Sequence, residues 1–202
     1  MTYTYKENTV KPTIVLDMDG VVACFVRRFT ALMLSVQGKD TRDAYGTGAQ
    51  LHWDFENHGF SKDVINKAWD SVRASETFWT TLPTLLTTEE RDEIRGLARD
   101  FTVKFVTSRV GLNVLQQTER WLSDRGLLVG TVIVAEDKVD IIKRFQPLAV
   151  IDDKPEVIEA LLEYGVMCYI RDFPYNRHVA GPRVSSMTEF VARVYALALT
   201  PA

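Results

Sequence analysis

The sequence has little cysteine. Its 202 residues include two, Cys24 and Cys168, which lie far apart and do not follow the spacing of a metal-binding motif. This spacing argues against a cysteine metal site and favours free thiols over a disulfide. We therefore expect both cysteines to be reduced core residues, as in proteins of a reducing cytoplasm.

The sequence also lacks a basic excess and a long apolar run. With 24 basic and 27 acidic residues the formal net charge is -3, which excludes a general nucleic-acid coat because a run of phosphates could not be neutralised. The net charge does not exclude a small anionic substrate, because such a substrate needs only a local positive pocket. No run approaches the ~20 apolar residues that cross a membrane, and the N-terminal residues do not resemble a signal sequence. We expect a cytoplasmic protein without a membrane partner or an extended nucleic-acid partner.

Short apolar runs recur along the chain and are typical of buried parallel strands. They lie at residues 13–16, 101–106, 131–135, 148–151 and 166–170. Segments of helical periodicity separate these runs. Strands that alternate with helices predict an α/β fold of three layers, in which helices cover both faces of a parallel sheet.

Three of the intervening helices carry specific signals. Residues 87–90 have the Thr-x-x-Glu spacing of a capping box, which is typical of a helix start. The next helix is expected to place Leu112, Leu115 and Leu122 on one face. A third helix is predicted between a proline and a glycine, across residues 155–165.

Residues 24–88 interrupt the alternation of strands and helices. They contain no convincing strand pattern, although they hold three of the four tryptophans. Apolar residues at helical spacing from Val64 to Phe78 predict a helix. We predict that residues 1–23 and 89–202 form the core, and that residues 24–88 form a small helical cap inserted between the first and second strands.

Polar side chains follow four of the predicted strands. The first strand is followed by Asp17 and Asp19, the second by Thr107, Ser108 and Arg109, the third by Lys138, and the fourth by Asp152 and Asp153. Ligands of open parallel sheets bind just beyond the carboxyl ends of the strands. We therefore expect these side chains, although scattered in sequence, to converge on one edge of the sheet.

Each of these signals has an ordinary alternative. Asp-Gly pairs are common in turns, Thr107 and Asp153 could cap helices, and Lys138 could be a solvated surface lysine. A calcium loop is excluded, because residues 21–23 offer no further oxygen ligands and no late glutamate follows. The joint arrangement favours a functional site, since four chance placements would have to fall at strand ends in a workable order.

The order of these four segments resembles the haloacid dehalogenase-like phosphatases. That family has a strand ending in DxDG, a strand ending in Thr or Ser, a lysine that opens a helix, and a strand ending in DD or GD. This chain shows IVLDMDGVV, VKFVTSR, EDKVDII and LAVIDDKPE in the same order. The resemblance covers most of the chain and implies a Rossmann-like core that hydrolyses phosphate monoesters.

The side chains also suit that chemistry on physical grounds. Two unit charges 4 Å apart repel by about 4 kcal/mol at an effective dielectric near 20, so an anionic phosphate and an attacking carboxylate need a cation between them. Magnesium prefers carboxylates together with phosphate oxygen and water. We expect Mg²⁺ to be held by the side chains of Asp17 and Asp153 and the carbonyl of Asp19, with Asp152 beside them.

The remaining roles follow from this arrangement. Asp17 is the expected nucleophile, which forms an aspartyl-phosphate. Asp19 is expected to protonate the leaving oxygen and later to activate water. Lys138 should hold both the phosphate and the nucleophile, while Thr107 and Ser108 should donate hydrogen bonds to the phosphoryl oxygens.

A closer resemblance links the chain to the 5'(3')-deoxyribonucleotidases of that superfamily. The segments KAW and FWTTLP resemble the aromatic part of their cap, and the late segment PYN resembles a loop after their last core strand. The resemblance implies that Trp69, Phe78 and Trp79 line a base pocket. The substrate it implies is a nucleoside monophosphate.

One departure from the nucleotidase pattern leaves the substrate open. In that family a proline and a lysine follow the Thr-Ser pair, whereas this chain has Arg109, Val110 and Gly111. Arg109 could bring the missing positive charge to the phosphate.

The alternative substrates are the 3'-phosphate of a polynucleotide end and a phosphorylated sugar or other metabolite. A non-catalytic binding module is disfavoured, because both Asp17 and Asp19 are present. The sequence does not indicate the oligomeric state, and a homodimer stays compatible with it.

Overall fold

The structure, a computed structural model, describes residues 10–45, 55–56 and 58–199. Six strands form one sheet in the order β3-β2-β1-β4-β5-β6, and all neighbouring strands run parallel. Their bounds are Thr13–Asp17 for β1, Thr102–Thr107 for β2, Thr131–Val134 for β3, Ala149–Asp152 for β4, Cys168–Arg171 for β5 and Arg183–Val184 for β6. The predicted α/β class with a parallel sheet is confirmed.

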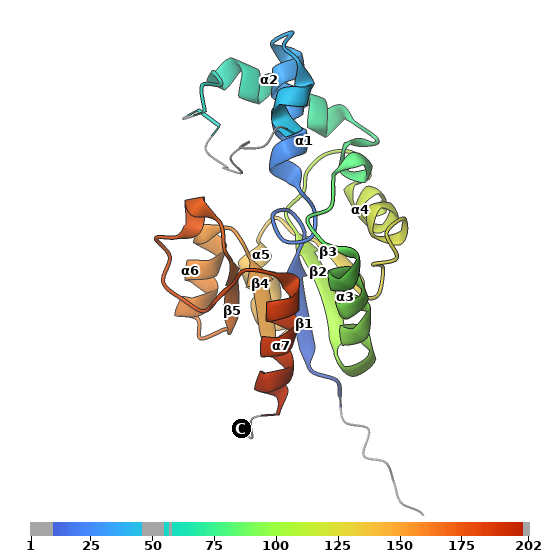
Figure 1. The fold of residues 1–202 in the computed structure, drawn as a ribbon, viewed down its shortest axis with the longest axis vertical. Helices are drawn as coiled ribbons and strands as arrows, with labels where there is room; N and C mark the ends of the chain where they lie inside the picture. The colour runs from blue at the N-terminus through green and yellow to red at the C-terminus, as the bar shows by residue number, and fades with distance from the viewer. Residues whose placement is uncertain (1–9, 46–54, 57, 200–202) are drawn as a thin grey trace, which may run out of the picture.

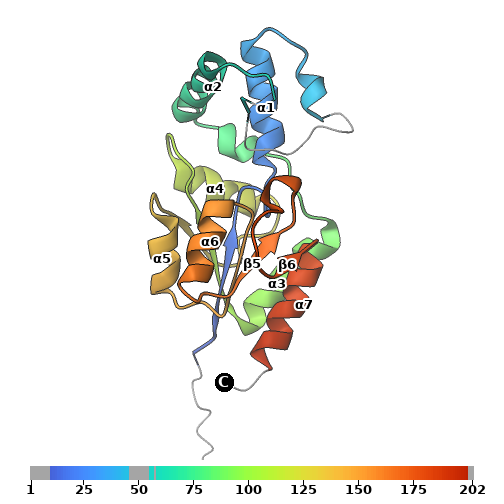
Figure 2. The same cartoon turned by 90° about the vertical axis from the view of Figure 1, so that its left-hand side faces the viewer.

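Helices cover both faces of this sheet (Figure 1). One face carries α3 (Thr88–Asp100), α4 (Val114–Ser123) and α7 (Met187–Ala198). The opposite face carries α5 (Lys138–Arg144) and α6 (Pro155–Glu163), which lie side by side in Figure 2. The sheet is therefore the middle of three layers.

Strand β1 shows why the strand sequences are continuous apolar runs. Ile14 and Leu16 belong to the core cluster under α3 and α7, whereas Val15 belongs to the cluster under α5 and α6. All three side chains are fully buried. Successive side chains of a strand point to opposite faces, so a strand covered on both sides needs an apolar residue at every position.

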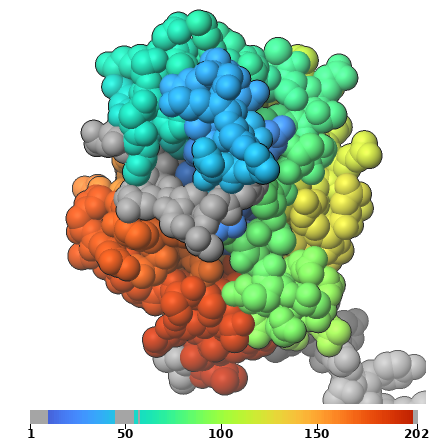
Figure 3. Space-filling view, turned by 45° about the horizontal axis from the view of Figure 1, so that its top comes forward, coloured from blue at the N-terminus to red at the C-terminus, as the bar shows by residue number. Residues whose placement is uncertain are grey.

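A helical segment lies beyond the carboxyl end of β1 (Figure 1). It contains α1 (Phe25–Val36), the 3₁₀ turn η1 (Thr41–Tyr45), α2 (Lys62–Ala74) and the 3₁₀ turn η2 (Phe78–Thr81). In the space-filling view, its blue and teal residues form one end of the molecule (Figure 3). The location suits a cover over the strand ends, where the candidate site was predicted.

The two chain connections to this helical segment run side by side. Ala23 and Thr84 form an antiparallel bridge. The N–H of Cys24 donates to the carbonyl of Pro83 at 2.8 Å, and the N–H of Leu85 donates to the carbonyl of Val22 at 3.0 Å. The segment thus leaves and rejoins the core at one point, although its apolar residues share one buried cluster with the core. The division into core and cap stays a prediction.

Two details of the predicted helices were wrong. Leu112 precedes α4, and both Leu112 and Leu115 are exposed, at 48% and 39%. The buried side of α4 carries Leu122, as expected, together with Val114 and Trp121. Phe78 does not extend α2, which ends at Ala74; it lies in η2.

Helix α1, strand β6 and helix α7 were not predicted. Helix α1 has the apolar spacing of a core helix, with Phe25, Phe29 and Met33 buried at intervals of four. Trp53, counted above among the tryptophans of the helical segment, lies outside the described residues. Among the described residues, no helix is long and apolar enough to cross a membrane.

Candidate active site

The first strand delivers two carboxylates into a tight loop. Asp17 is the last residue of β1, and Asp19 follows two residues later. The loop closes because the N–H groups of Val22 and Ala23 both donate to the carbonyl of Met18, at 3.0 and 2.8 Å. These bonds hold the two aspartates at the carboxyl end of the central strand.

Gly20 is required in this loop for two reasons. Its φ of +92° lies in a region that favours glycine. A Cβ atom there would lie 2.1 Å from Oδ2 of Asp153, so any other side chain would displace that carboxylate. The glycine therefore lets the first loop and the end of β4 approach each other.

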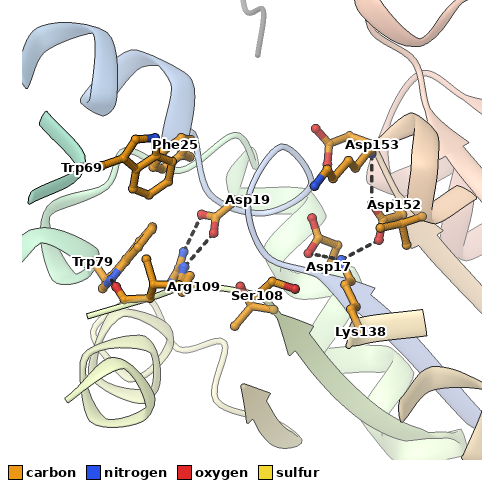
Figure 4. A pocket seen from close by; sticks show the side chains of 14 residues that line it. Asp17, Asp19, Phe25, Trp69, Trp79, Ser108, Arg109, Lys138, Asp152 and Asp153 are labelled. Carbon is orange, nitrogen blue, oxygen red and sulfur yellow. Dashed lines mark hydrogen bonds and ion pairs between the residues drawn. The ribbon is translucent and has the colours of Figure 1, made fainter. Parts of the chain in front are cut away.

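Lys138 lies between two of the carboxylates. It opens α5 and is 7% exposed. Its ammonium Nζ donates to Oδ1 of Asp17 at 2.5 Å and lies 2.5 Å from Oδ2 of Asp152 (Figure 4). The N–H of Lys154 donates to the other oxygen of Asp152 at 3.0 Å. The structure thus brings Asp17 together with Lys138 and Asp152, which follow it by more than 100 positions in the sequence.

Asp17, Asp152 and Asp153 form a buried acidic cluster. Each offers a carboxylate oxygen, and these oxygens lie within 4.8 Å of one another. The three residues are 5%, 0% and 0% exposed. With all three ionised, three negative charges lie together, and Lys138 contacts two of them, Asp17 and Asp152. Uncompensated charge is costly in a buried site.

The acidic cluster fits a hard divalent cation such as magnesium. Its donors are carboxylate oxygens, which magnesium prefers, and a divalent ion would offset part of their negative charge. Asp17, Asp152 and Asp153 are the side chains that would hold it. The carboxylate of Asp19 does not belong to this cluster, since it pairs elsewhere.

The pKa values of the cluster reflect this crowding. Burial raises the pKa of the Asp17 carboxyl well above its usual value; Lys138 opposes that shift, and the carboxylates of Asp152, Asp153 and Asp19 add to it. Burial alone would lower the pKa of Lys138, but Asp152 and Asp17 outweigh it and raise that pKa above the ordinary value. Lys138 therefore stays protonated and supplies one of the charges that an ionised Asp17 needs.

Thr107 and Ser108 follow β2 directly. Thr107 ends the strand and is buried, whereas Ser108 is exposed, and both line the same cavity as the acidic cluster. The carbonyl of Thr107 accepts from the N–H of Ala135 at 2.9 Å, which ties the strand end to the loop after β3. Both side chains carry a hydroxyl group, which can donate a hydrogen bond to an anion.

Arg109 forms a buried ion pair with Asp19. Its Nε and Nη2 donate to the two carboxylate oxygens of Asp19, both at 2.8 Å, and its Nη1 donates to Oγ1 of Thr118 at 3.0 Å. The side chains of Arg109 and Asp19 are 0% and 11% exposed. This contact was not foreseen, because the sequence suggested that Arg109 faces the phosphate. Thr118 was not singled out either.

The aromatic side chains of the helical segment gather at the other end of the cavity. Phe25 stacks against Trp69 and against Trp79, with ring centroids 5.5 and 5.7 Å apart. Trp79 is 2% exposed, and its indole N–H donates to the carbonyl of Val110 at 3.0 Å. Phe78 is buried against Trp79 and is not among the residues that line the cavity.

The cavity has a volume of about 290 Å³ and two chemically different ends. In Figure 4, one end holds Lys138 and the acidic cluster of Asp17, Asp152 and Asp153, and the other end holds Phe25 and the two tryptophans. The pair of Asp19 and Arg109 lies between them. Phe25 was missed by the sequence interpretation, although its spacing to Phe29 marked it as part of a buried helical face.

No protein-family model matches the chain. Among curated proteins, it is 24% identical over 139 residues to a Bacillus cereus protein named "Putative nucleotidase", an alignment that covers 66% of this chain and 72% of that protein.

Solved structures with the same fold come from the haloacid dehalogenase-like hydrolases. One, from Streptococcus pneumoniae, has a TM-score of 0.63 at 13% identity and covers 91% of this chain and 98% of its own. Another, from Bacillus subtilis, is described as bound to magnesium; it has a TM-score of 0.58 at 14% identity and covers 92% of this chain and 99% of its own. The chain therefore has the fold of these hydrolases, as the four sequence motifs implied.

Proposed function

We propose that the protein is a magnesium-dependent phosphomonoester hydrolase in which Asp17 attacks phosphorus. The observation that carries this proposal is the buried cluster of Asp17, Asp152 and Asp153 beside Lys138, at the carboxyl ends of parallel strands. Three buried carboxylates that lie this close repel one another. A divalent cation would offset that repulsion and would also attract the anionic phosphate.

The proposed reaction assigns each bond made or broken to a named side chain. A carboxylate oxygen of Asp17 bonds to phosphorus, and the bond from phosphorus to the ester oxygen breaks. The leaving oxygen takes a proton from Asp19. Water, activated by Asp19, then attacks the phosphorus and releases inorganic phosphate and the Asp17 carboxylate. The cation contributes charge neutralisation between the two anions when it is bound.

The ion pair of Asp19 and Arg109 has to open in this scheme. Both oxygens of Asp19 accept hydrogen bonds from the guanidinium, so in this arrangement the carboxylate is engaged by Arg109 and not by a substrate. An incoming phosphate competes for the same guanidinium, since arginine binds phosphate in the bidentate manner in which it binds a carboxylate. We propose that substrate draws Arg109 onto the phosphate and leaves Asp19 to act as acid and base.

Lys138, Thr107 and Ser108 complete the phosphate site in this proposal. Lys138 already contacts the nucleophile at 2.5 Å, and its positive charge lowers the repulsion between Asp17 and the phosphate. The hydroxyl groups of Thr107 and Ser108, which line the cavity, would donate to the phosphoryl oxygens as charge builds on them.

The proposed substrates are nucleoside monophosphates, including deoxynucleotides. The separation of a charged end from an aromatic end suits a molecule that carries a phosphate at one end and a planar base at the other. Trp69 is the better candidate for a base contact, because it lines the cavity and is partly exposed, whereas Trp79 is almost fully buried. The name of the Bacillus cereus relative agrees with this substrate class.

We further propose that residues 24–88 act as a cap that selects the substrate. Phe25, Trp69 and Trp79 all come from this segment, whereas the acidic cluster comes from the core. The chemistry and the recognition of the leaving group would thus reside in different parts of the chain.

A phosphate-release screen tests this function. The purified protein would be assayed with magnesium on deoxynucleoside and ribonucleoside monophosphates, on a 3'-phosphorylated oligonucleotide and on sugar phosphates, with and without chelator. We expect the highest catalytic efficiency on nucleoside monophosphates and no turnover without metal. Preference for the oligonucleotide or for a sugar phosphate would replace the nucleotidase proposal by one of the alternatives, and full activity in metal-free buffer would contradict the site itself.

A further inference from the structure

The turn after β5 is joined to the acidic cluster by a buried asparagine. Asn176 ends the 3₁₀ turn η3 (Pro174–Asn176) and is fully buried. Its Nδ2 donates to the carbonyls of Asp153 and Arg171, at 2.9 and 2.8 Å. Its Oδ1 accepts from the N–H of Phe173 at 3.1 Å and from Nη1 of Arg183 at 3.0 Å. One side chain therefore fixes the main chain after β4 relative to β5 and to the turn.

The neighbouring residue reaches the carboxylate of the same aspartate. The hydroxyl of Tyr175 donates to Oδ2 of Asp153. The Tyr175 ring stacks on Phe173, with the centroids 5.2 Å apart and the rings 8° from parallel. The position of the ring thus has a support that does not depend on the hydroxyl group. Gly20 approaches the same carboxylate oxygen, as the 2.1 Å contact of a Cβ at that position shows.

We propose that Tyr175 and Asn176 are positioning residues for the divalent cation. Asn176 fixes the main chain of Asp153, and Tyr175 fixes the rotation of its carboxylate. The inference rests on the proposed function, because the cation is the one that the acidic cluster would hold. A carboxylate rotates about two bonds, and a hydrogen bond that selects the ligating orientation in advance lowers the entropy lost on metal binding.

The substitution Tyr175→Phe tests this role, since it removes one oxygen and keeps the stacked ring. Isothermal titration calorimetry of the metal-free protein with magnesium chloride would give the dissociation constant. The dissociation constant should rise about 10-fold or more, because loss of a hydrogen-bond partner of a metal ligand typically lowers the metal affinity by about 10- to 100-fold. The thermal midpoint without metal should stay close to that of the wild type, and turnover should recover at saturating magnesium.

Tyr164→Phe is the matched control. Tyr164 is 62% exposed, lies next to the end of α6, and its ring lies under the ammonium of Lys143, 3.3 Å from the ring centroid. Removal of its hydroxyl should leave the dissociation constant for magnesium unchanged.

Asn176→Asp retains the size of the side chain and loses the two donated hydrogen bonds. It should therefore both weaken magnesium binding and lower the thermal midpoint.

The outcomes separate this inference from the function on which it rests. If the wild type binds magnesium and Tyr175→Phe has the same dissociation constant, the inference is overturned and the proposed function is not. An equal rise in Tyr175→Phe and Tyr164→Phe also overturns it, since the effect would not depend on contact with Asp153. A wild-type protein that takes up no magnesium overturns the proposed function and this inference with it.

Discussion

Replacement of Arg109 by methionine should destabilise the protein strongly. The guanidinium is fully buried and makes two 2.8 Å bonds to Asp19 and one 3.0 Å bond to Thr118. Its carbon Cζ also lies 4.8 Å from the ring centroid of Trp79. Methionine fills part of the space but leaves the carboxylate of Asp19, which is 11% exposed, without its cation.

The expected magnitude follows from the burial of the pair. Removal of one partner of a buried ion pair costs about 3–5 kcal/mol, because the other charge stays buried and uncompensated. For a domain of this size 1 kcal/mol corresponds to about 2–4 °C, so the thermal midpoint should fall by about 6–20 °C. The slight exposure of Asp19 favours the lower half of that range.

Thermal unfolding of four proteins measures the effect: the wild type, Arg109→Met, Asp19→Asn and the double variant. Because the two side chains contact each other, the double variant should lose less free energy than the sum of the single variants, by about 0.5–3 kcal/mol. Arg120→Met is the control; Arg120 pairs with Asp124 at 3.8 Å on the exposed side of α4 and should contribute ~1 kcal/mol or less. Additive losses, or an Arg109→Met variant as stable as the control, would refute the energetic role of the pair.

Three further predictions concern the walls of the site. Gly20→Ala should abolish both magnesium binding in calorimetry and phosphate release, because its Cβ would displace Asp153; normal binding would contradict the packing. Gln117→Leu removes the partner of the main-chain N–H of Trp79 and of the carbonyls of Ser75 and Leu112; it should lower the free energy of unfolding in urea by about 1–3 kcal/mol, whereas a neutral result would refute the link. Trp69→Ala should reduce catalytic efficiency on a nucleotide by about 1–3 kcal/mol relative to a small phosphate ester without a base, and an unchanged ratio would remove Trp69 from the base contact.

The five longer strands and the positions of the motif residues could be predicted from the sequence, whereas the two-residue strand β6 could not. The central strands β1 and β4 are buried on both faces, so their apolar runs are unbroken, and an aspartate marks the end of each. The capping box was confirmed, with Thr87 and Glu90 bonded reciprocally at 3.2 and 2.9 Å. Parallel strands bring their carboxyl ends to one edge, which is why Asp17 and Lys138 could be expected together from residues 121 positions apart.

Side-chain pairings could not be predicted in the same way. The sequence places Arg109 near the phosphate, but it does not reveal that Asp19 lies within reach, since that contact depends on the packing of the loop after β2 against the loop after β1. The expected leucine stripe was right at Leu122 alone: Leu112 and Leu115 are exposed, and the other buried apolar residues of α4 are Val114 and Trp121. Phe25 was missed because its helix was read as part of an undivided cap segment.

The rate of phosphate release by Asp17→Asn tests the central claim most directly. The amide keeps the volume of the carboxylate and removes the nucleophile, so the variant should fold and show background turnover of a deoxynucleoside monophosphate with magnesium. Asp124→Asn, the same change at a 58% exposed side chain on the end of α4, should retain the wild-type rate. Wild-type rates from pure, undeamidated Asp17→Asn would contradict the assignment of Asp17 as the nucleophile.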